Sequence, residues 1–242
     1  ENVVKLARMI GYTPKSARSA RTVCNIAVQT AFPYPKSVTI AAGLVLNYTG
    51  LDNNNFVFSI PTDISQSVDS LTGIASFNNI TLFEGLYLTD TFVKDTSQRQ
   101  RFILTNDRVD TTSMIVQVTS GTITEKYLQA TDITKITADS KVFFLEESEY
   151  QIPEILFGDG VIGKALLNGD VVTVKYTTSA GRGANGLKVF ENIGTYRDNL
   201  NNAITSGITI NAISFPDGGA EPETTESIKF SAPKFYSAFG RA

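Results

Sequence analysis

The sequence predicts a mainly β fold with peripheral helices, an α+β arrangement in which antiparallel β-sandwich or meander lobes carry helical segments near both termini. Short segments rich in β-branched and aromatic residues recur along the chain, and Gly, Asn, Asp and Ser separate them. Helical spacing of apolar residues is clearest near the two ends. The predicted strands cover residues 22–29, 38–48, 56–60, 80–88, 101–104, 114–118, 142–145 and 171–176. Gly85 predicts a bulge or bend within 80–88.

The first helix is predicted at the N-terminus. Val3, Leu6, Ala7 and Ile10 recur at helical spacing, and Gly11 is placed to end the helix.

The second helix is predicted near the C-terminus, where acids crowd what would be its first turn. Ile228, Ala232 and Phe235 would share one face, and Pro233 is expected to kink or break the helix. A further short helix is expected over 198–203. These elements suggest four parts: an N-terminal helix and basic linker (1–20), a first β-rich lobe (21–120), a second β-rich lobe (121–215) and a C-terminal helical segment (216–242).

Composition narrows the classes of function. The 242 residues are 42% hydrophobic and 19% charged, as in an ordinary globular protein, and the net charge of −3 gives no overall attraction to nucleic acid or anionic lipid. No histidine is present, which excludes Ser-His-Asp and Cys-His catalysis. The single cysteine, Cys24, alternates with apolar residues of a predicted strand and is interpreted as a core residue rather than a reactive thiol. We therefore expect that the protein is not an enzyme and that it has neither a cofactor site nor a metal site.

Charge is distributed unevenly. Residues 1–36 carry six basic residues against one acid, whereas acids dominate 139–160. Two solvated faces would account for this pattern, and so would complementary patches that meet within the fold or across a subunit boundary. The basic residues in the first stretch are Lys5, Arg8, Lys15, Arg18, Arg21 and Lys36.

The stretch Gly158-Asp-Gly-Val-Ile-Gly-Lys-Ala165 matches both G-x-G-x-x-G and most of a phosphate-binding P-loop. A P-loop needs Ser or Thr where Ala165 stands, and it must open a helix. Here Asn168-Gly169 predicts a turn and a strand follows it. We interpret Gly158, Asp159, Gly160 and Gly163 as structural turn residues in a β-meander. We expect a hairpin at Phe157-Gly-Asp-Gly160, the FGDG hairpin, in the second β-rich lobe.

A second match, Gly181-Arg-Gly-Ala-Asn-Gly186, also lacks the helix and parallel strand of a dinucleotide fold. Gly181, Gly183 and Gly186 are expected to provide positive φ angles or a close backbone approach.

Three blocks together resemble the baseplate J-like family, whose members are structural components of contractile phage tails and related injection machines. One block is Leu6-Ala-Arg-Met-Ile-Gly-Tyr-Thr-Pro14, the second runs from Glu154 through the Gly181–Gly186 loop, and the third runs from Gly218 to Pro233 and ends at Gly240-Arg-Ala242. The blocks occur in the family's order and cover most of the chain. In the family the Arg-Ala ending continues into helical sequence, so we expect this chain to be a fragment of a longer polypeptide.

The resemblance implies a scaffold without catalytic residues, a component of the virion's tail baseplate that is made in the host cytoplasm. It implies copies of itself and other baseplate wedge proteins as partners, with no nucleic acid, membrane or small-molecule substrate. Residues of the terminal blocks and the basic stretch are the candidate interface residues: Arg8, Lys15, Arg18, Arg21, Glu226, Ile228 and Phe235.

Two other classes of function remain open from the residues. A β-rich, tail-associated carbohydrate-binding module would use the nine tyrosines and fifteen phenylalanines, although tryptophan is absent. A phosphate-using enzyme would depend on the Gly158–Lys164 motif alone.

Overall fold

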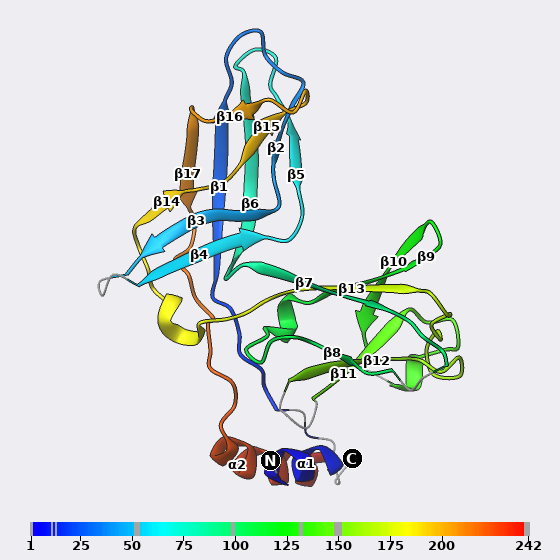
Figure 1. Ribbon diagram of the computed structural model, residues 1–242. Coiled ribbons are helices and arrows are strands. Elements are labelled where there is room, and N and C mark those ends of the chain that lie inside the picture. The colour runs from blue at the N-terminus through cyan, green and yellow to red at the C-terminus, as the bar shows by residue number, and fades with distance from the viewer. Residues whose placement is uncertain are drawn as a thin grey trace. The chain divides into compact units, whose positions relative to one another are not determined.

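The computed structural model describes residues 2–10, 12, 14–50, 54–97, 100–130, 133–147 and 152–239, and it is mainly β with an α-helix near each end of the chain (Figure 1). The predicted fold class is therefore confirmed. The chain forms two compact units, each built from segments that are distant in sequence. We call residues 18–87 and 177–221 the sandwich unit, and residues 1–17, 88–176 and 222–242 the helix-bearing unit.

The sandwich unit contains a six-stranded sheet, in the order β14-β3-β4-β6-β1-β17, and a four-stranded sheet, in the order β16-β15-β2-β5. All of the strand pairs described in these two sheets are antiparallel. Its elements are β1 (Arg21–Gln29), β2 (Ser37–Ile40), β3 (Gly43–Thr49), β4 (Asn55–Ile60), β5 (Ile64–Ser67), β6 (Ile74–Glu84), the 3-10 turn Gly181–Ala184, β14 (Phe190–Asn192), β15 (Tyr196–Asp198), β16 (Ala203–Ile204) and β17 (Ile208–Ala212).

The two sheets of the sandwich unit share one hydrophobic core. In β1, Cys24, Ile26 and Val28 are buried at alternate positions, as predicted for a strand with one face inward. Val38 and Ile40 of β2 enter the same core from the other sheet.

The helix-bearing unit contains a seven-stranded sheet in the order β7-β13-β9-β10-β11-β12-β8. Among the pairs whose register is described, β10 and β11 run parallel, and the β9–β10, β11–β12, β8–β12 and β9–β13 pairs are antiparallel. Val116, Val172 and Tyr176 are among the buried residues of its core. The elements are α1 (Asn2–Met9), β7 (Tyr87–Val93), β8 (Phe102–Ile103), β9 (Ile115–Ser120), β10 (Ile123–Gln129), β11 (Val142–Glu147), β12 (Pro153–Phe157), β13 (Val171–Thr177), α2 (Thr225–Phe239) and the 3-10 turns Thr111–Ser113 and Ile133–Lys135.

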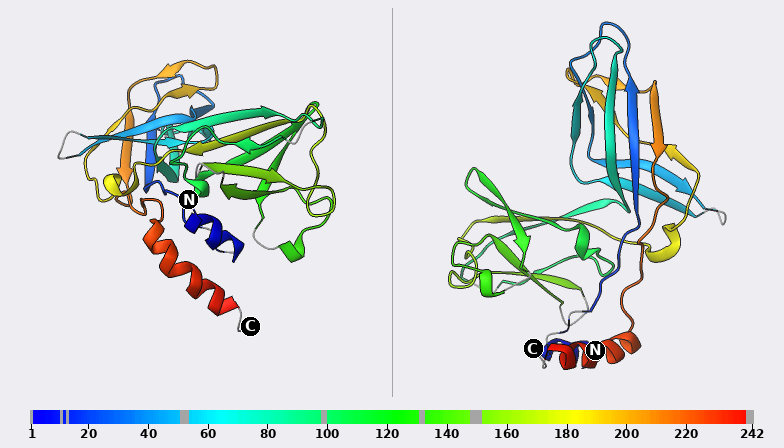
Figure 2. Two further views of the ribbon diagram at one scale, coloured as in Figure 1. Left: turned by 60° about the horizontal axis from the view of Figure 1, so that its bottom comes forward. Right: turned by 180° about the vertical axis from the view of Figure 1, so that it is seen from behind.

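Helices α1 and α2 pack against each other and bury Val4, Ala7, Ile228 and Ala232 in a small core of their own (Figure 2). Leu6, one of the apolar residues at helical spacing in α1, is 61% exposed. Gly11, the predicted end of the helix, lies outside the described residues. In the described part of the chain, no helix has both the length and the apolar character that crossing a membrane requires.

Three secondary-structure predictions were wrong in detail. Residues 38–48 form two strands, because the chain turns at Gly43, where φ is +117°. Residues 80–88 are likewise divided between β6 and β7 at Gly85, whose φ is +98°. The expected helix over 198–203 is a turn between β15 and β16, since the Asp198 carboxylate accepts hydrogen bonds from the backbone N–H groups of Leu200 and Asn202. Separately, helix α2 contains Pro233 and is not broken there.

The structure also corrects the expected lobes, 21–120 and 121–215. Ser120 and Gly121 are at the turn of the antiparallel β9–β10 hairpin, so both sides of that boundary belong to one sheet. The chain passes between the units at residues 17–18, 87–88, 176–177 and 221–222 instead. Segments 1–20 and 216–242 are consequently divided between the two units as well.

Cys24 provides a test of the sandwich core. Its side chain is fully buried, and desolvation raises the thiol pKa to about 11. Because the thiolate is the reactive form, we expect the native protein to react with a thiol reagent at pH 8 far more slowly than the denatured protein does. A stopped-flow measurement of Cys24 modification with and without denaturant tests this. Equal rates in the two states would contradict the burial of this strand face.

Candidate functional site

The first glycine loop connects β12 with the segment before β13. No α-helix begins directly after Lys164. Ala165 forms an isolated bridge with Gly158, and Asn168-Gly169 lies in the turn that precedes β13. The expected β-meander, or FGDG hairpin, is therefore wrong. Strand β13 pairs with β9 and β7, whereas β12 pairs with β11 and β8, so the two strands that flank the loop are not neighbours.

The backbone N–H groups of this loop donate to acceptors within the chain. One oxygen of the Asp159 carboxylate accepts from the amides of Val161 and Ile162, both at 2.9 Å. These two bonds hold the Asp159 pKa below its ordinary value. The Gly160 amide donates to the Gly163 carbonyl at 3.0 Å, and the Gly163 amide donates to Thr137. These groups bind the protein itself, where a P-loop would direct them at phosphate.

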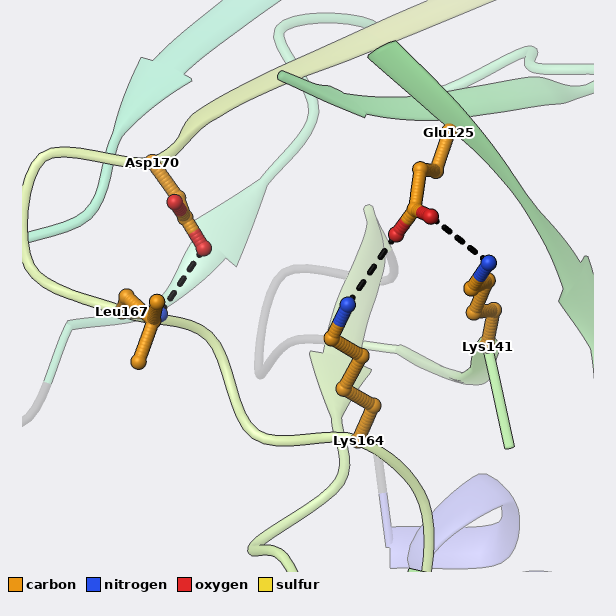
Figure 3. Close-up of polar contacts among 5 residues, drawn as sticks. All are labelled: Glu125, Lys141, Lys164, Leu167 and Asp170. Atoms are coloured by element: carbon orange, nitrogen blue, oxygen red, sulfur yellow. Dashed lines mark hydrogen bonds and ion pairs between the residues drawn. The ribbon is translucent and has the colours of Figure 1, made fainter. Parts of the chain in front are cut away.

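Lys164 forms part of an ion cluster (Figure 3). Its ammonium lies 3.0 Å from one oxygen of Glu125, and the ammonium of Lys141 lies 2.6 Å from the other. Hydrogen bonding to Lys141, followed by that to Lys164, lowers the Glu125 pKa, and the bond to Glu125 raises the Lys164 pKa. The Lys164 side chain therefore joins the loop to β10, and its ammonium pairs with a carboxylate of the chain where a P-loop lysine would meet phosphate.

The three glycines of the first loop have different roles. Gly160 and Gly163 have φ values of +88° and +86°, a region that L side chains rarely adopt. Gly158 does not have a positive φ, but a Cβ at Gly158 would lie 2.2 Å from the backbone of Gly163. Gly158 is thus required for close approach of the backbone, and Gly160 for backbone conformation.

The second glycine loop, Gly181–Gly186, forms a 3-10 turn and packs against the segment 216–221. The Asn185 side chain donates to the Gly219 carbonyl and accepts from the Gly219 amide, each at 2.9 Å. The Gly186 amide donates to the Pro216 carbonyl at 2.7 Å. A side-chain amide therefore pairs with an extended backbone in the way that a neighbouring strand would.

Close packing explains the composition of both segments. A Cβ at Gly181 would lie 1.8 Å from the Glu221 carboxylate, and a Cβ at Gly219 would lie 2.4 Å from the Gly181 carbonyl. Gly183 faces the Phe56 ring, which a Cβ would approach to 3.0 Å. Gly181 and Gly186 also have positive φ angles. The backbone that approaches this loop is the chain's own segment 216–221.

The candidate interface residues differ in exposure. Lys15, Arg18, Arg21 and Glu226 are exposed, and the Arg21 guanidinium lies 5.0 Å from the centroid of the Phe83 ring. Ile228 is only 2% exposed, because it packs between the two helices, so its side chain is not an accessible interface residue.

The remaining candidates are at the helices. Phe235 is partly buried and lies edge-on to Tyr12, with ring centroids 5.7 Å apart. Arg8 belongs to α1, but its side chain is outside the part that the structure describes.

Several exposed apolar side chains were not predicted from the sequence. On the helix pair, Leu6, Phe230 and Tyr236 are 61%, 67% and 60% exposed. Phe230 and Tyr236 lie about 120° apart around α2. They are therefore separate exposed apolar positions, which the apolar stripe through Ile228 and Ala232 does not include.

Glu154 of the acidic stretch forms an ion pair with Arg101. The Glu154 side chain is buried, and both of its carboxylate oxygens accept hydrogen bonds from the Arg101 guanidinium. The distance from Arg101 Nε to Glu154 Oε1 is 2.8 Å. Arg101 lies outside the basic stretch 1–36, so this pair does not join the two stretches. Among the described residues, no group of three or more His, Cys, Asp or Glu side chains is arranged to hold a metal ion.

The distinct roles of Gly158 and Gly160 predict different costs of substitution. We expect G158A to lower the free energy of unfolding by about 3 kcal/mol or more, since its Cβ would overlap the Gly163 backbone. G160A should cost only about 1–2 kcal/mol, because its Cβ has space and the cost is conformational. G121A, at φ +61° with open space around it, is the matched control for the conformational cost. Urea unfolding curves measure all three, and equal losses for G158A and G160A would contradict the assignment.

The ion cluster predicts the titration of Glu125. K141A should raise the Glu125 pKa toward its ordinary value more than K164A does, since Lys141 is the larger cause of the lowering. The stabilisation from these pairs should be present above the ordinary glutamate pKa and be lost as the pH falls through the lowered value. Carbon-detected NMR titration of the side-chain carboxyl measures this order, and an unchanged Glu125 pKa in both variants would refute the cluster.

Comparison with known proteins adds no relative: no family model matches the chain, and no curated protein sequence is significantly similar to it.

Proposed function

We propose that the protein is a structural subunit of a contractile-tail baseplate wedge, located in the virion after assembly in the host cytoplasm. In this role it binds copies of itself and other wedge proteins, contributes to the ring that joins the wedges around the hub, and rearranges when the sheath contracts. It acts without a cofactor and catalyses no reaction. The resemblance of three ordered sequence blocks to baseplate J-like proteins is the starting point for this proposal.

The observation that carries the proposal is the internal use of both glycine motifs. The amides of Gly160, Val161, Ile162 and Gly163 have acceptors in the chain, and Lys164 pairs with Glu125. The motif that suggested a phosphate-using enzyme therefore has a structural explanation. A scaffold requires this kind of fixed geometry and no reactive group.

Contact between two of the resemblance blocks gives further support. The Gly181–Gly186 loop and the segment beginning at Gly218 are far apart in sequence, but Asn185 and Gly219 are joined by two hydrogen bonds. A shared structural role explains why glycine-rich sequences occur in both blocks. Exposed Leu6, Phe230 and Tyr236 provide apolar surface suited to protein partners.

Assembly is the direct test. Size-exclusion chromatography with light scattering should show complexes when the protein is mixed with the wedge proteins of a contractile tail. The triple variant L6S/F230S/Y236S should weaken these complexes, and S76K/T81K, which alters exposed positions of β6 in the sandwich unit, is the control for a general surface change. A protein that forms no complex with any tail component would contradict the proposal.

One observation favours the carbohydrate-binding alternative. Phe32 is 82% exposed and lies edge-on to Tyr34, with ring centroids 5.6 Å apart, so two aromatic rings are accessible to a sugar. A glycan array with the wild-type protein and F32A separates the alternatives. Binding that F32A abolishes would support the module, whereas the wedge proposal predicts no binding.

A further inference from the structure

Strand β17 forms an edge of the six-stranded sheet, where it pairs with β1 on one side (Figures 1 and 2). The register places Ile210 opposite Ile26, and the Gln29 amide donates to the Gly207 carbonyl while the Ile213 amide donates to Val23. Bonds in an antiparallel ladder recur at every second residue. The backbone groups of Ile208, Ile210 and Ala212 therefore point away from β1, toward the outer edge.

This edge lacks the features with which proteins usually prevent strand pairing. No charged residue occurs between Asp198 and Asp217, and β17 contains neither proline nor a bulge. The other edges differ: β7 carries Asp90, β14 carries Glu191, and Arg101 precedes β8. The strands β5 and β16 are short, with four and two residues. Strand β17 is thus the longest uncharged edge among the described strands.

The strand is complementary to itself. An antiparallel pair centred on Ile210 would place Ile208 opposite Ala212 of a second copy, and Thr209 opposite Asn211. Apolar residues would then meet apolar residues, polar residues would meet polar ones, and no like charges would come together. Ile208 and Ile210 are only partly buried at the border of the core, so a second copy would extend the apolar layer over them.

We propose that β17 is a self-pairing surface, through which two copies of this chain form a continuous sheet about a two-fold axis at Ile210. This surface would provide the self-association that the proposed function includes, and the inference rests on the proposed function in that respect alone. The partner is a second copy, because the strand matches its own reverse in side-chain character along its whole length.

Charge substitutions at the exposed face of β17 test the pairing. In the predicted register Thr209 and Asn211 of the two copies are directly opposite, so T209K/N211K would bring like charges together and weaken dimerisation about tenfold. T209E/N211E should do the same. An equimolar mixture of the two variants should recover the dimer, since opposite charges then face each other. S76K/T81K adds the same charge to an interior strand of the same sheet and should leave dimerisation unchanged.

Sedimentation equilibrium gives the dimerisation constants, and amide hydrogen exchange locates the contact. The amides of Ile208, Ile210 and Ala212 should become protected as the concentration rises, whereas Thr209 and Asn211 should be protected at all concentrations by β1. A wild-type chain that remains monomeric, or a dimer that the lysine variant leaves intact, overturns the proposal. The proposal is also overturned if the outer amides of β17 are protected from hydrogen exchange only when another protein is present. A β17 dimer that binds no tail component would support the pairing and contradict the wedge function.

Discussion

Close contact between backbone segments at glycine is the constraint on which both glycine-rich regions depend. Gly158 lies against Gly163, and Gly181 lies beneath Glu221 and beside Gly219, at separations where a Cβ would overlap neighbouring atoms. This packing brings amides and carbonyls within hydrogen-bonding distance of acceptors and donors in the same chain. The sequence that resembles a nucleotide-binding motif therefore folds as a tightly closed loop.

The sequence was sufficient to predict the fold class and much of the strand content. Alternation around Cys24 predicted β1, and helical spacing at Ile228 and Ala232 predicted the inward face of α2. The division into units was not predictable, because each unit combines distant segments and local patterns contain no information about which strands will pair. Gly85 shows the difficulty: the residue suggested a bend, but only the structure shows that one strand ends there and the next begins.

The structural role of the first glycine loop was predictable from the sequence, but the residues that contact it were not. The absence of a helix signal after Lys164 argued correctly against a P-loop. The partners Glu125 and Lys141 are distant in sequence from the loop, and no spacing rule identifies them. Ile228 shows the opposite failure, since a residue proposed for an interface is required for the internal contact between α1 and α2. The surfaces that we propose for partners are exposed positions outside the amphipathic pattern, such as Phe230, and the uncharged edge at Ile210.

The central claim is that the first glycine loop binds the protein itself and holds no ligand. Titration of the ¹⁵N-labelled protein with Mg²⁺-ATP, and separately with inorganic phosphate, while following the amide resonances of Gly160, Val161, Ile162 and Gly163, tests it most directly. We expect these resonances to keep their chemical shifts up to millimolar concentrations of either ligand. Saturable shifts confined to these amides would contradict it and would restore a nucleotide or phosphate site.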